Sequence, residues 1–384
     1  MKVEIGNICT LKSGTSLKEA ALDTKGNIPY VKVSDMNLVG NEKYIVRANT
    51  YVSDDISSKM LFPAGTVLFP KRGGAIGTNK KRIAKKTVCA DLNIMGVIPS
   101  VKINPLYLYY YFQNIDFGTL YNGSSVPQIN NTDIAPMEIE LLSLDEQDKI
   151  INLLEKTDTI IRKRKEELAS LDDLIKARFV EMFGDPYVNP KGWIECALSE
   201  KLNLVGGYAF KSDMFDENGE IPVLRIGNIN TGYFKPIKLV YWQEDESLER
   251  YAMHPGDLVM SLTGTVGKDD YGNVCILGDE YEMYYLNQRN AKLEIKEGID
   301  KFYLSQLLKF DQIKKKLTGI SRGVRQANIS NKDILNLVVP VPPIELQNQF
   351  AAFVNQVDKS KVVVQKALDE SQILFNSLMQ QYFG

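Results

Sequence analysis

The chain has few of the residues that hold metals or activate nucleophiles. It contains 4 cysteines and 1 histidine in 384 residues, and no two cysteines form a Cys-x-x-Cys pair. A zinc site needs about four nitrogen, sulfur or oxygen ligands at short spacings. The sequence holds no such set, so we expect no bound metal and interpret the cysteines as buried, reduced thiols.

Long apolar runs are missing as well. No segment approaches the ~20 apolar residues of a membrane-spanning helix, and the first residues lack the basic start and apolar middle of a signal peptide. We therefore expect a cytoplasmic protein without a membrane partner. An apolar content of 44 % and a charged content of 24 % are typical of globular domains, and the length suits two of them.

Catalytic signatures are absent too. The glycines of residues 264–268 lie too close together for the phosphate-binding pattern Gly-x4-Gly-Lys-Ser/Thr. The single histidine, His254, leaves a serine or cysteine nucleophile without a second histidine to activate it, and we interpret His254 as structural. The pattern favours a binding protein over an enzyme.

Charge of one sign is concentrated in one segment. The net charge of -2 argues against a protein that coats nucleic acid without regard to sequence, because that affinity comes mostly from phosphate neutralisation. However, no acidic residue occurs between Asp55 and Asp91, and residues 71–86 within this stretch hold seven basic residues: Lys71, Arg72, Lys80, Lys81, Arg82, Lys85 and Lys86.

The second half of the chain repeats the first. At an offset of 200, residues 131–134 match residues 331–334, Gln147 matches Gln347, and Phe183-Gly184 matches Phe383-Gly384. Further upstream the offset is 190 at residues 74–77 and 193 at residues 26–29, which indicates insertions and deletions. Each copy therefore has a variable front and a back that keeps its register.

The back of each copy predicts one long helix. Apolar residues recur there at alternating steps of four and three, the 3.5-residue period of a coiled-coil seam. We expect helices at 145–183 and 345–384, the first of them roughly 58 Å long. A short Pro/Gly linker at 184–192 connects the first helix to the second copy. Because the linker is short, the second helix pairs most easily with the first if the two run antiparallel.

The fronts, residues 1–144 and 193–344, read as α/β (α+β) domains. Short β-branched runs at 28–33, 66–69 and 257–260 lie between glycine turns and predict strands. Residues 105–114 predict a helix, with a partner near 299–317. The expected architecture is thus two pseudo-repeats of an α/β (α+β) domain, joined by two long antiparallel coiled-coil helices.

Loops in the fronts carry side chains suited to DNA. Arginine can grip guanine and glutamine can grip adenine through paired hydrogen bonds, and cations beside glycines can approach a phosphate. In the first copy the candidates are Lys12, Ser13, Lys71, Arg72, Lys80, Lys81, Arg82, Ser124 and Gln128. In the second they are Arg225, Asn228, Lys268, Arg289, Arg322, Arg325 and Gln326. Each could instead be turn chemistry or solvated charge.

This arrangement resembles the DNA specificity (S) subunit of type I restriction-modification systems, over the whole chain. The first helix closes with Phe-Val-Glu-Met-Phe-Gly-Asp-Pro at 179–186, and residues 379–384 are its degraded second copy. The helix entries at 144–147 and 343–347 match the pattern Ile/Leu-Pro-Glu/Gln-x-x-Glu-Gln, the first without its proline and the second with Gln for Glu.

The resemblance implies a non-catalytic subunit in which each target-recognition domain reads one half of an asymmetric, bipartite DNA target. Two methyltransferase (M) subunits would dock on the helical scaffold, and restriction (R) subunits would join for cleavage. S-adenosylmethionine, ATP and Mg²⁺ would bind to those partners and not to this chain. Two other interpretations stay open at this stage: a coiled-coil adaptor that binds proteins only, and an enzyme with an unusual site.

Overall fold

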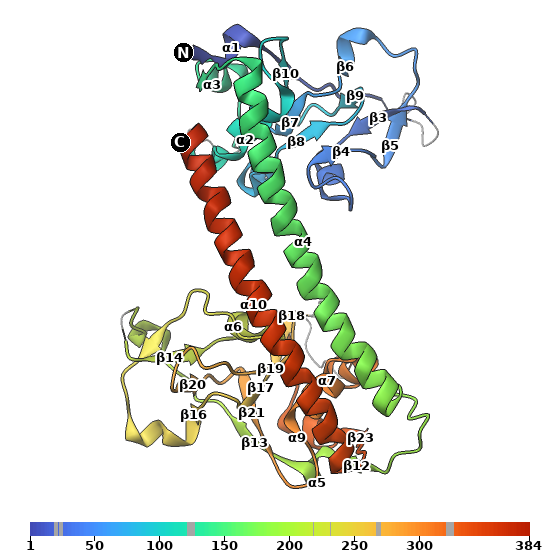
Figure 1. Ribbon diagram of the computed structural model, residues 1–384, viewed down its shortest axis with the longest axis vertical. Coiled ribbons are helices and arrows are strands. Elements are labelled where there is room, and N and C mark those ends of the chain that lie inside the picture. The colour runs from blue at the N-terminus through green and yellow to red at the C-terminus, as the bar shows by residue number, and fades with distance from the viewer. Residues whose placement is uncertain are drawn as a thin grey trace. The chain divides into compact units, whose positions relative to one another are not determined.

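The computed structural model (Figure 1) describes residues 1–18, 22, 26–120, 127–217, 219–230, 232–265, 270–319 and 326–384. The chain forms two compact units. Unit 1 comprises Met1–Lys165 and Lys366–Gly384, and unit 2 comprises Glu166–Gln365. Each unit thus contains one globular front, the beginning of one long helix and the end of the other.

The front of unit 1 contains two main sheets. The first has the order β2-β10-β7-β8-β4, and the second has the order β5-β3-β9-β6 with a parallel central pair, β3 and β9. A two-stranded ribbon joins β1 (Lys2–Glu4) to β11 (Glu138–Glu140). The strands are β2 (Cys9–Ser13), β3 (Ile28–Val31), β4 (Tyr44–Ile45), β5 (Thr50–Val52), β6 (Leu61–Phe62), β7 (Val67–Pro70), β8 (Arg82–Ala84), β9 (Val88–Ala90) and β10 (Ile94–Pro99); the helices are α1 (Ile5–Ile8), α2 (Pro105–Gln113) and α3 (Asn131–Ile134).

Unit 2 repeats this topology. Its sheets have the orders β13-β21-β17-β19 and β15-β14-β20-β16, again with a parallel central pair, β14 and β20. The strands are β12 (Glu195–Ala197), β13 (Leu202–Gly206), β14 (Ile221–Leu224), β15 (Tyr241–Trp242), β16 (Ala252–Met253), β17 (Leu258–Ser261), β18 (Thr263–Thr265), β19 (Val274–Ile276), β20 (Tyr284–Leu286), β21 (Asn290–Ile295), β22 (Gln326–Asn328) and β23 (Val338–Pro340). The predicted duplication is confirmed.

The helices of unit 2 differ from the prediction in one place. They are α5 (Leu198–Lys201), α6 (Ile226–Ile229), α7 (Lys301–Leu308), α8 (Asp311–Thr318) and α9 (Asn331–Leu335). The single helix expected near 299–317 is therefore two helices. They are separated at Phe310, which has an extended backbone and packs its ring against Phe179 at 5.1 Å between centroids.

Two 40-residue helices, α4 (Leu144–Phe183) and α10 (Ile344–Phe383), begin and end within one residue of the expected positions. At the start of α4, Ser143 and Glu146 exchange hydrogen bonds between side chain and backbone, which satisfies two free N–H groups of the helix end. The helix stops at Gly184, whose φ of 81° lies in the left-handed region that glycine adopts without strain.

The helices pack antiparallel within each unit. In unit 1 the core contains Ile150 and Leu154 from the start of α4 together with Leu378 and Met379 from the end of α10. In unit 2 the core contains the end of α4 and the start of α10, where the rings of Phe179 and Phe350 lie 5.5 Å apart. Since the start of one helix lies beside the end of the other in both units, the predicted antiparallel pairing is confirmed.

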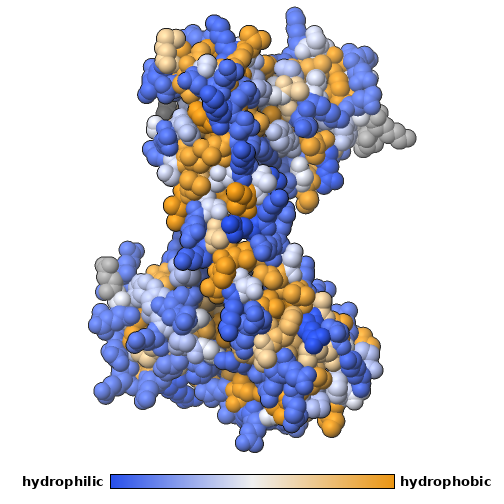
Figure 2. All heavy atoms as spheres, viewed as in Figure 1, coloured by the Kyte–Doolittle hydropathy of each residue, from blue (hydrophilic) through white to orange (hydrophobic). Residues whose placement is uncertain are grey.

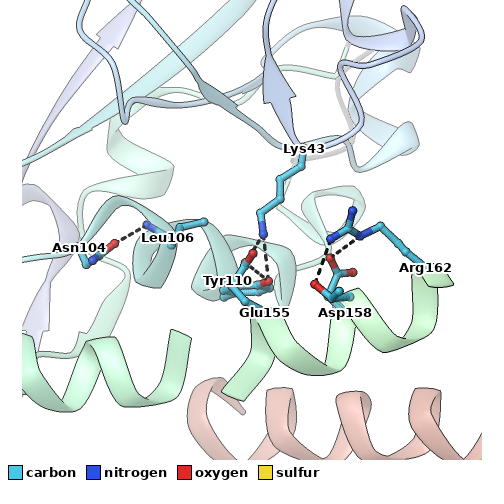
Figure 3. A network of polar contacts seen from close by, with 8 residues as sticks. Lys43, Asn104, Leu106, Tyr110, Glu155, Asp158 and Arg162 are labelled. Carbon is cyan, nitrogen blue, oxygen red and sulfur yellow. Dashed lines mark hydrogen bonds and ion pairs between the residues drawn. The ribbon is translucent and has the colours of Figure 1, made fainter. Parts of the chain in front are cut away.

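A polar network ties the front of unit 1 to α4 (Figure 3). The ammonium of Lys43 pairs with the Glu155 carboxylate and donates to the Tyr110 hydroxyl at 3.1 Å, while that hydroxyl donates to Glu155. One turn further along α4, Arg162 pairs with Asp158 at 3.2 Å. Burial and the neighbouring carboxylate raise the pKa of Tyr110 well above its usual value.

The surface is mixed in character, with apolar side chains among polar ones (Figure 2). Several of the exposed apolar residues lie on α10, where Val362, Val363 and Ile373 are each about two thirds exposed. Within the described ranges, no helix is both long and apolar enough to cross a membrane.

Candidate nucleic-acid interface

In unit 1 the fold brings Arg72 and Gln128 together. The two residues form an antiparallel backbone bridge, and Arg72 Nε donates to Gln128 Oε1 at 3.1 Å. Gln128 in turn donates to the Asn130 side chain at 2.5 Å. Arg72 is exposed, so this pair presents a guanidinium and an amide at the surface beside Gly73, whose φ is 69°.

Lys71, Lys12 and Ser13 make their side-chain contacts within the protein. Lys71 is buried and donates to Ser13 Oγ at 2.7 Å, and burial lowers its pKa. Lys12 donates to the Leu61 carbonyl at 2.8 Å, with its ammonium 4.6 Å from the centre of the Phe62 ring. Since these ammonium groups already have protein partners, their positions favour a role in holding the loops over direct contact with DNA.

The central residue of the basic run at 80–82 is buried. Lys81 is only 1 % exposed, and its ammonium donates to Asn79 Oδ1 and to the Ile115 carbonyl, each at 2.6 Å. Burial lowers the pKa of Lys81 to about 8. This placement contradicts the predicted DNA contact of Lys81, because its ammonium is buried and its hydrogen bonds are already made to two acceptors of the protein.

The neighbours of Lys81 are also engaged. The guanidinium of Arg82 donates to the carbonyls of Lys81 and Met36, at 2.8 and 3.1 Å, and Lys80 donates to the Asn37 side chain. Both side chains remain partly exposed, so their contact with DNA stays a prediction.

Unit 2 builds the same bridge with other residues. Strands β18 and β22 pair Thr263 with Asn328 and Thr265 with Gln326. The N–H of Ile329 donates to the Leu262 carbonyl, as that of Ile129 does to the Lys71 carbonyl, so Thr263 occupies the position of Arg72. Gln326 takes part in this bridge through its backbone pairing with Thr265. The predicted residues Ser124, Lys268, Arg322 and Arg325 lie outside the described residues.

Asn228 is a structural residue. It is 1 % exposed, accepts a hydrogen bond from the Arg225 N–H at 3.0 Å, and donates to the carbonyls of Lys235 and Ile237, both at 3.0 Å. This burial contradicts the predicted base contact of Asn228. In unit 1 Asp35 has the same role and accepts from the Lys32 N–H at 2.8 Å.

Two hollows lie side by side in unit 2 and share Ile226 and Arg289 as lining residues. The larger, of about 620 Å³, is lined among others by Phe210, Phe215, Arg225, Lys238 and Gln288. The smaller, of about 320 Å³, is lined among others by Asn230, Thr263, Thr265 and Asp270. The fold thus brings the predicted residues Arg225 and Arg289 to one region, where Arg289 is exposed.

Sequence reasoning missed several residues of these hollows. Phe210, Phe215, Asn230 and Lys238 lie outside the strands and carry no shared motif or spacing. The parallel pairing of β14 with β20 helps to gather them, since it brings the chain around 224 beside the chain around 286. That pairing has no local sequence signal.

These features define a class: a protein of two homologous α+β recognition domains bound to an antiparallel helix pair. Within the described residues no group of His, Cys, Asp and Glu could hold a metal ion. The family model for the type I restriction modification DNA specificity domain matches residues 1–170 and again 190–370, and the chain belongs to this family. Membership supports sequence-specific DNA recognition by a subunit that is itself non-catalytic.

Individual relatives agree with this assignment. The specificity subunit of the type I restriction enzyme MjaVIII from Methanocaldococcus jannaschii is 25 % identical and aligns over 89 % of this chain and 87 % of its own length. That of EcoBI from Escherichia coli is 27 % identical over 44 % of this chain and 34 % of its own length. The crystal structure of an S subunit from M. genitalium has the same fold, with a TM-score of 0.56, 17 % identity and coverage of 100 % and 96 %.

Proposed function

We propose that the chain reads a bipartite, asymmetric DNA target, with one half recognised by each unit. The observation that supports this is that the two units have the same backbone bridge but different side chains on it. Where unit 1 has Arg72 opposite Gln128, unit 2 has Thr263 opposite Asn328. Different hydrogen-bonding groups at equivalent positions would select different bases, so the two half-sites would differ.

The proposal extends to the partners. The relatives are named as specificity subunits of type I restriction enzymes. A second solved structure with the same fold was determined to explain how the type I R-M system assembles as a complex. We propose that two M subunits dock on the repeated helices, and that R subunits join where the system cleaves. Leu174 and Leu374 sit 200 residues apart and are 46 % and 52 % exposed, which suits two equivalent docking positions.

The proposed roles of the partners also determine where the cofactors would bind. S-adenosylmethionine, ATP and Mg²⁺ would be bound by the partners, and this chain would bind none of them. Because the net charge is -2, the partners would also supply much of the phosphate neutralisation. We expect the isolated chain to bind DNA weakly and to lose affinity steeply with added salt.

Methylation mapping of a host genome with and without this gene tests the function. The expected result is a split, asymmetric motif, methylated on adenine, that appears only when the gene is present. An unchanged methylation map, with the chain and its M subunits expressed and assembled, would rule the proposal out. A palindromic motif would retain DNA recognition but contradict the unlike half-sites.

A further inference from the structure

The smaller hollow of unit 2 contains polar atoms that have no partner within the protein. Thr263 Oγ1 and Asn230 Oδ1 are both buried, and neither has a hydrogen-bond partner among the described residues. Thr263 as a whole is only 9 % exposed. Buried polar atoms in native proteins nearly always have a partner, so two such atoms lining one hollow indicate a ligand that supplies the missing bonds.

A strong donor lines the same hollow. The Arg289 carbonyl accepts from the Leu262 N–H at 2.8 Å, which fixes its backbone beside the residue that precedes Thr263. On another wall, Asp270 Oδ1 accepts from the Thr265 N–H at 2.7 Å, so part of this carboxylate is used to hold β18. The hollow therefore combines a guanidinium donor, an amide acceptor and a hydroxyl that can do either.

Unit 1 satisfies the equivalent atoms internally. Asn37 matches Asn230, because each follows by two residues the side chain that caps its turn, and the Asn37 oxygen accepts from Lys80. Asn93 matches Arg289, because its carbonyl accepts from the Lys71 N–H, and its side chain donates to Asp91 at 2.6 Å. The open acceptor is thus a property of unit 2 and not of the shared fold.

We propose that this hollow reads one guanine–cytosine pair in the major groove of the half-site bound by unit 2. The proposal rests on the DNA-reading function proposed above. Guanine presents two acceptors, O6 and N7, which match the forked donors of Arg289. Cytosine presents one amino donor, N4, which matches the free oxygen of Asn230. The Thr263 hydroxyl can donate to guanine O6 as well, because a carbonyl oxygen has two lone pairs.

The test uses the complex assembled with its M subunits and duplexes that carry each base pair in turn at every position of the target. R289A should reduce the preference for guanine–cytosine at one position of one half-site by about 10- to 100-fold. T263V, which keeps the shape and removes the hydroxyl, should give a smaller loss at the same position. R250A removes an exposed arginine of the same unit that does not line the hollow, and should leave every preference unchanged.

Three results would overturn the assignment. An equal loss on all duplexes would mean that Arg289 contacts phosphate, unchanged preferences would mean that it contacts nothing, and a loss at an adenine–thymine pair would mean that the chemistry is misassigned. If R289A fails to fold, T263V alone decides by the same criteria. A wild-type complex with no base preference in this half-site would instead refute the proposed function.

Discussion

Units 1 and 2 share a framework held by buried hydrogen bonds and differ at the surface. In both, a buried glutamine on the long helix accepts a backbone N–H at 2.8 Å, Gln147 from Asn104 and Gln347 from Asp300. In both, a buried tyrosine donates to a strand carbonyl, Tyr107 to Glu140 and Tyr303 to Pro340. The bridge that lies at the surface of unit 1, between Arg72 and Gln128, by contrast carries other side chains in unit 2, where Thr263 is buried. A duplicated scaffold can therefore carry different side chains at equivalent positions without changing its fold.

The helix contacts of the two units also differ. In unit 2 the Phe179 ring lies within 5.5 Å of the rings of Phe183, Tyr303, Phe310 and Phe350, measured between centroids. The equivalent position in unit 1 is Met379, which is 6 % exposed. A flexible thioether thus stands where unit 2 has the central ring of the cluster, and we expect the helix pair to be held more firmly in unit 2.

The largest expected effect is the loss of this ring cluster. F179A should reduce the free energy of unfolding of unit 2 by about 3–5 kcal/mol, whereas M379A should cost unit 1 about 2 kcal/mol. Both tryptophans, Trp193 and Trp242, belong to unit 2, so tryptophan fluorescence during urea unfolding reports that unit alone.

The two variants can therefore be separated in one experiment. F179A should lower the urea midpoint seen by fluorescence, and M379A should lower only a midpoint seen by circular dichroism. Equal costs for the two variants would remove the proposed difference in helix packing.

The next effect tests what the units share. Q147A and Q347A should each destabilise their own unit by about 2–3 kcal/mol, because each leaves buried backbone groups without partners. The two costs should agree closely, since Gln147 and Gln347 are both 0 % exposed and both also donate to two carbonyls. Q356A, on an exposed turn of α10, is the matched control. A marked difference between the two costs would show that the framework is not equivalent.

The parts of this fold that could be predicted from the sequence are those marked by a regular spacing of residues. The repeat, the two 40-residue helices and their antiparallel pairing all follow from apolar spacing and from residues such as Phe183 and Gly184. The break at Phe310 was missed, because a buried aromatic residue continues a helical pattern whether or not the helix continues.

The candidate site was only partly predictable. Arg72, Gln128 and Arg289 were found by residue type beside glycines or turns, and they lie at the surface bridge or line the hollows. Lys81 was misassigned because a count of charges does not show burial, and its acceptor at Ile115 lies 34 residues away. Long-range partners of this kind have no local signal in the sequence.

Lys81 also marks a difference between the units. The register of β7 with β8 and of β17 with β19 places Val274, which is fully buried, at the equivalent position in unit 2. The folded pKa of Lys81 is about 8 and its ordinary value is 10.5. Between those pH values the unfolded chain binds more protons than the folded chain, so this lysine makes stability rise with pH across the window.

K81V therefore makes unit 1 resemble unit 2 and should abolish that rise. The free energy of unfolding of the wild type should increase relative to K81V by about 1–3 kcal/mol between pH 8 and pH 10. Urea unfolding followed by circular dichroism at both pH values gives this difference, and comparison with the variant cancels the titration of other groups. A constant difference would mean that the pKa of Lys81 is the same in the folded and the unfolded chain, so that burial does not lower it.

The smallest expected effect concerns the ion pair of Figure 3. Glu155 in unit 1 corresponds to Asn355 in unit 2, so E155N removes a contact that unit 2 lacks at this position. The Lys43 and Glu155 side chains are 19 % and 32 % exposed, whereas those of Arg162 and Asp158 one turn away are 61 % and 31 % exposed. We expect E155N to cost unit 1 about 1 kcal/mol and D158N about 0.3 kcal/mol.

Added salt should weaken the more exposed pair and leave the cost of E155N nearly unchanged, because a partly buried pair is screened less. Equal costs with equal salt dependence would show that Lys43 and Glu155 form an ordinary surface pair and do not anchor the front of unit 1 to α4.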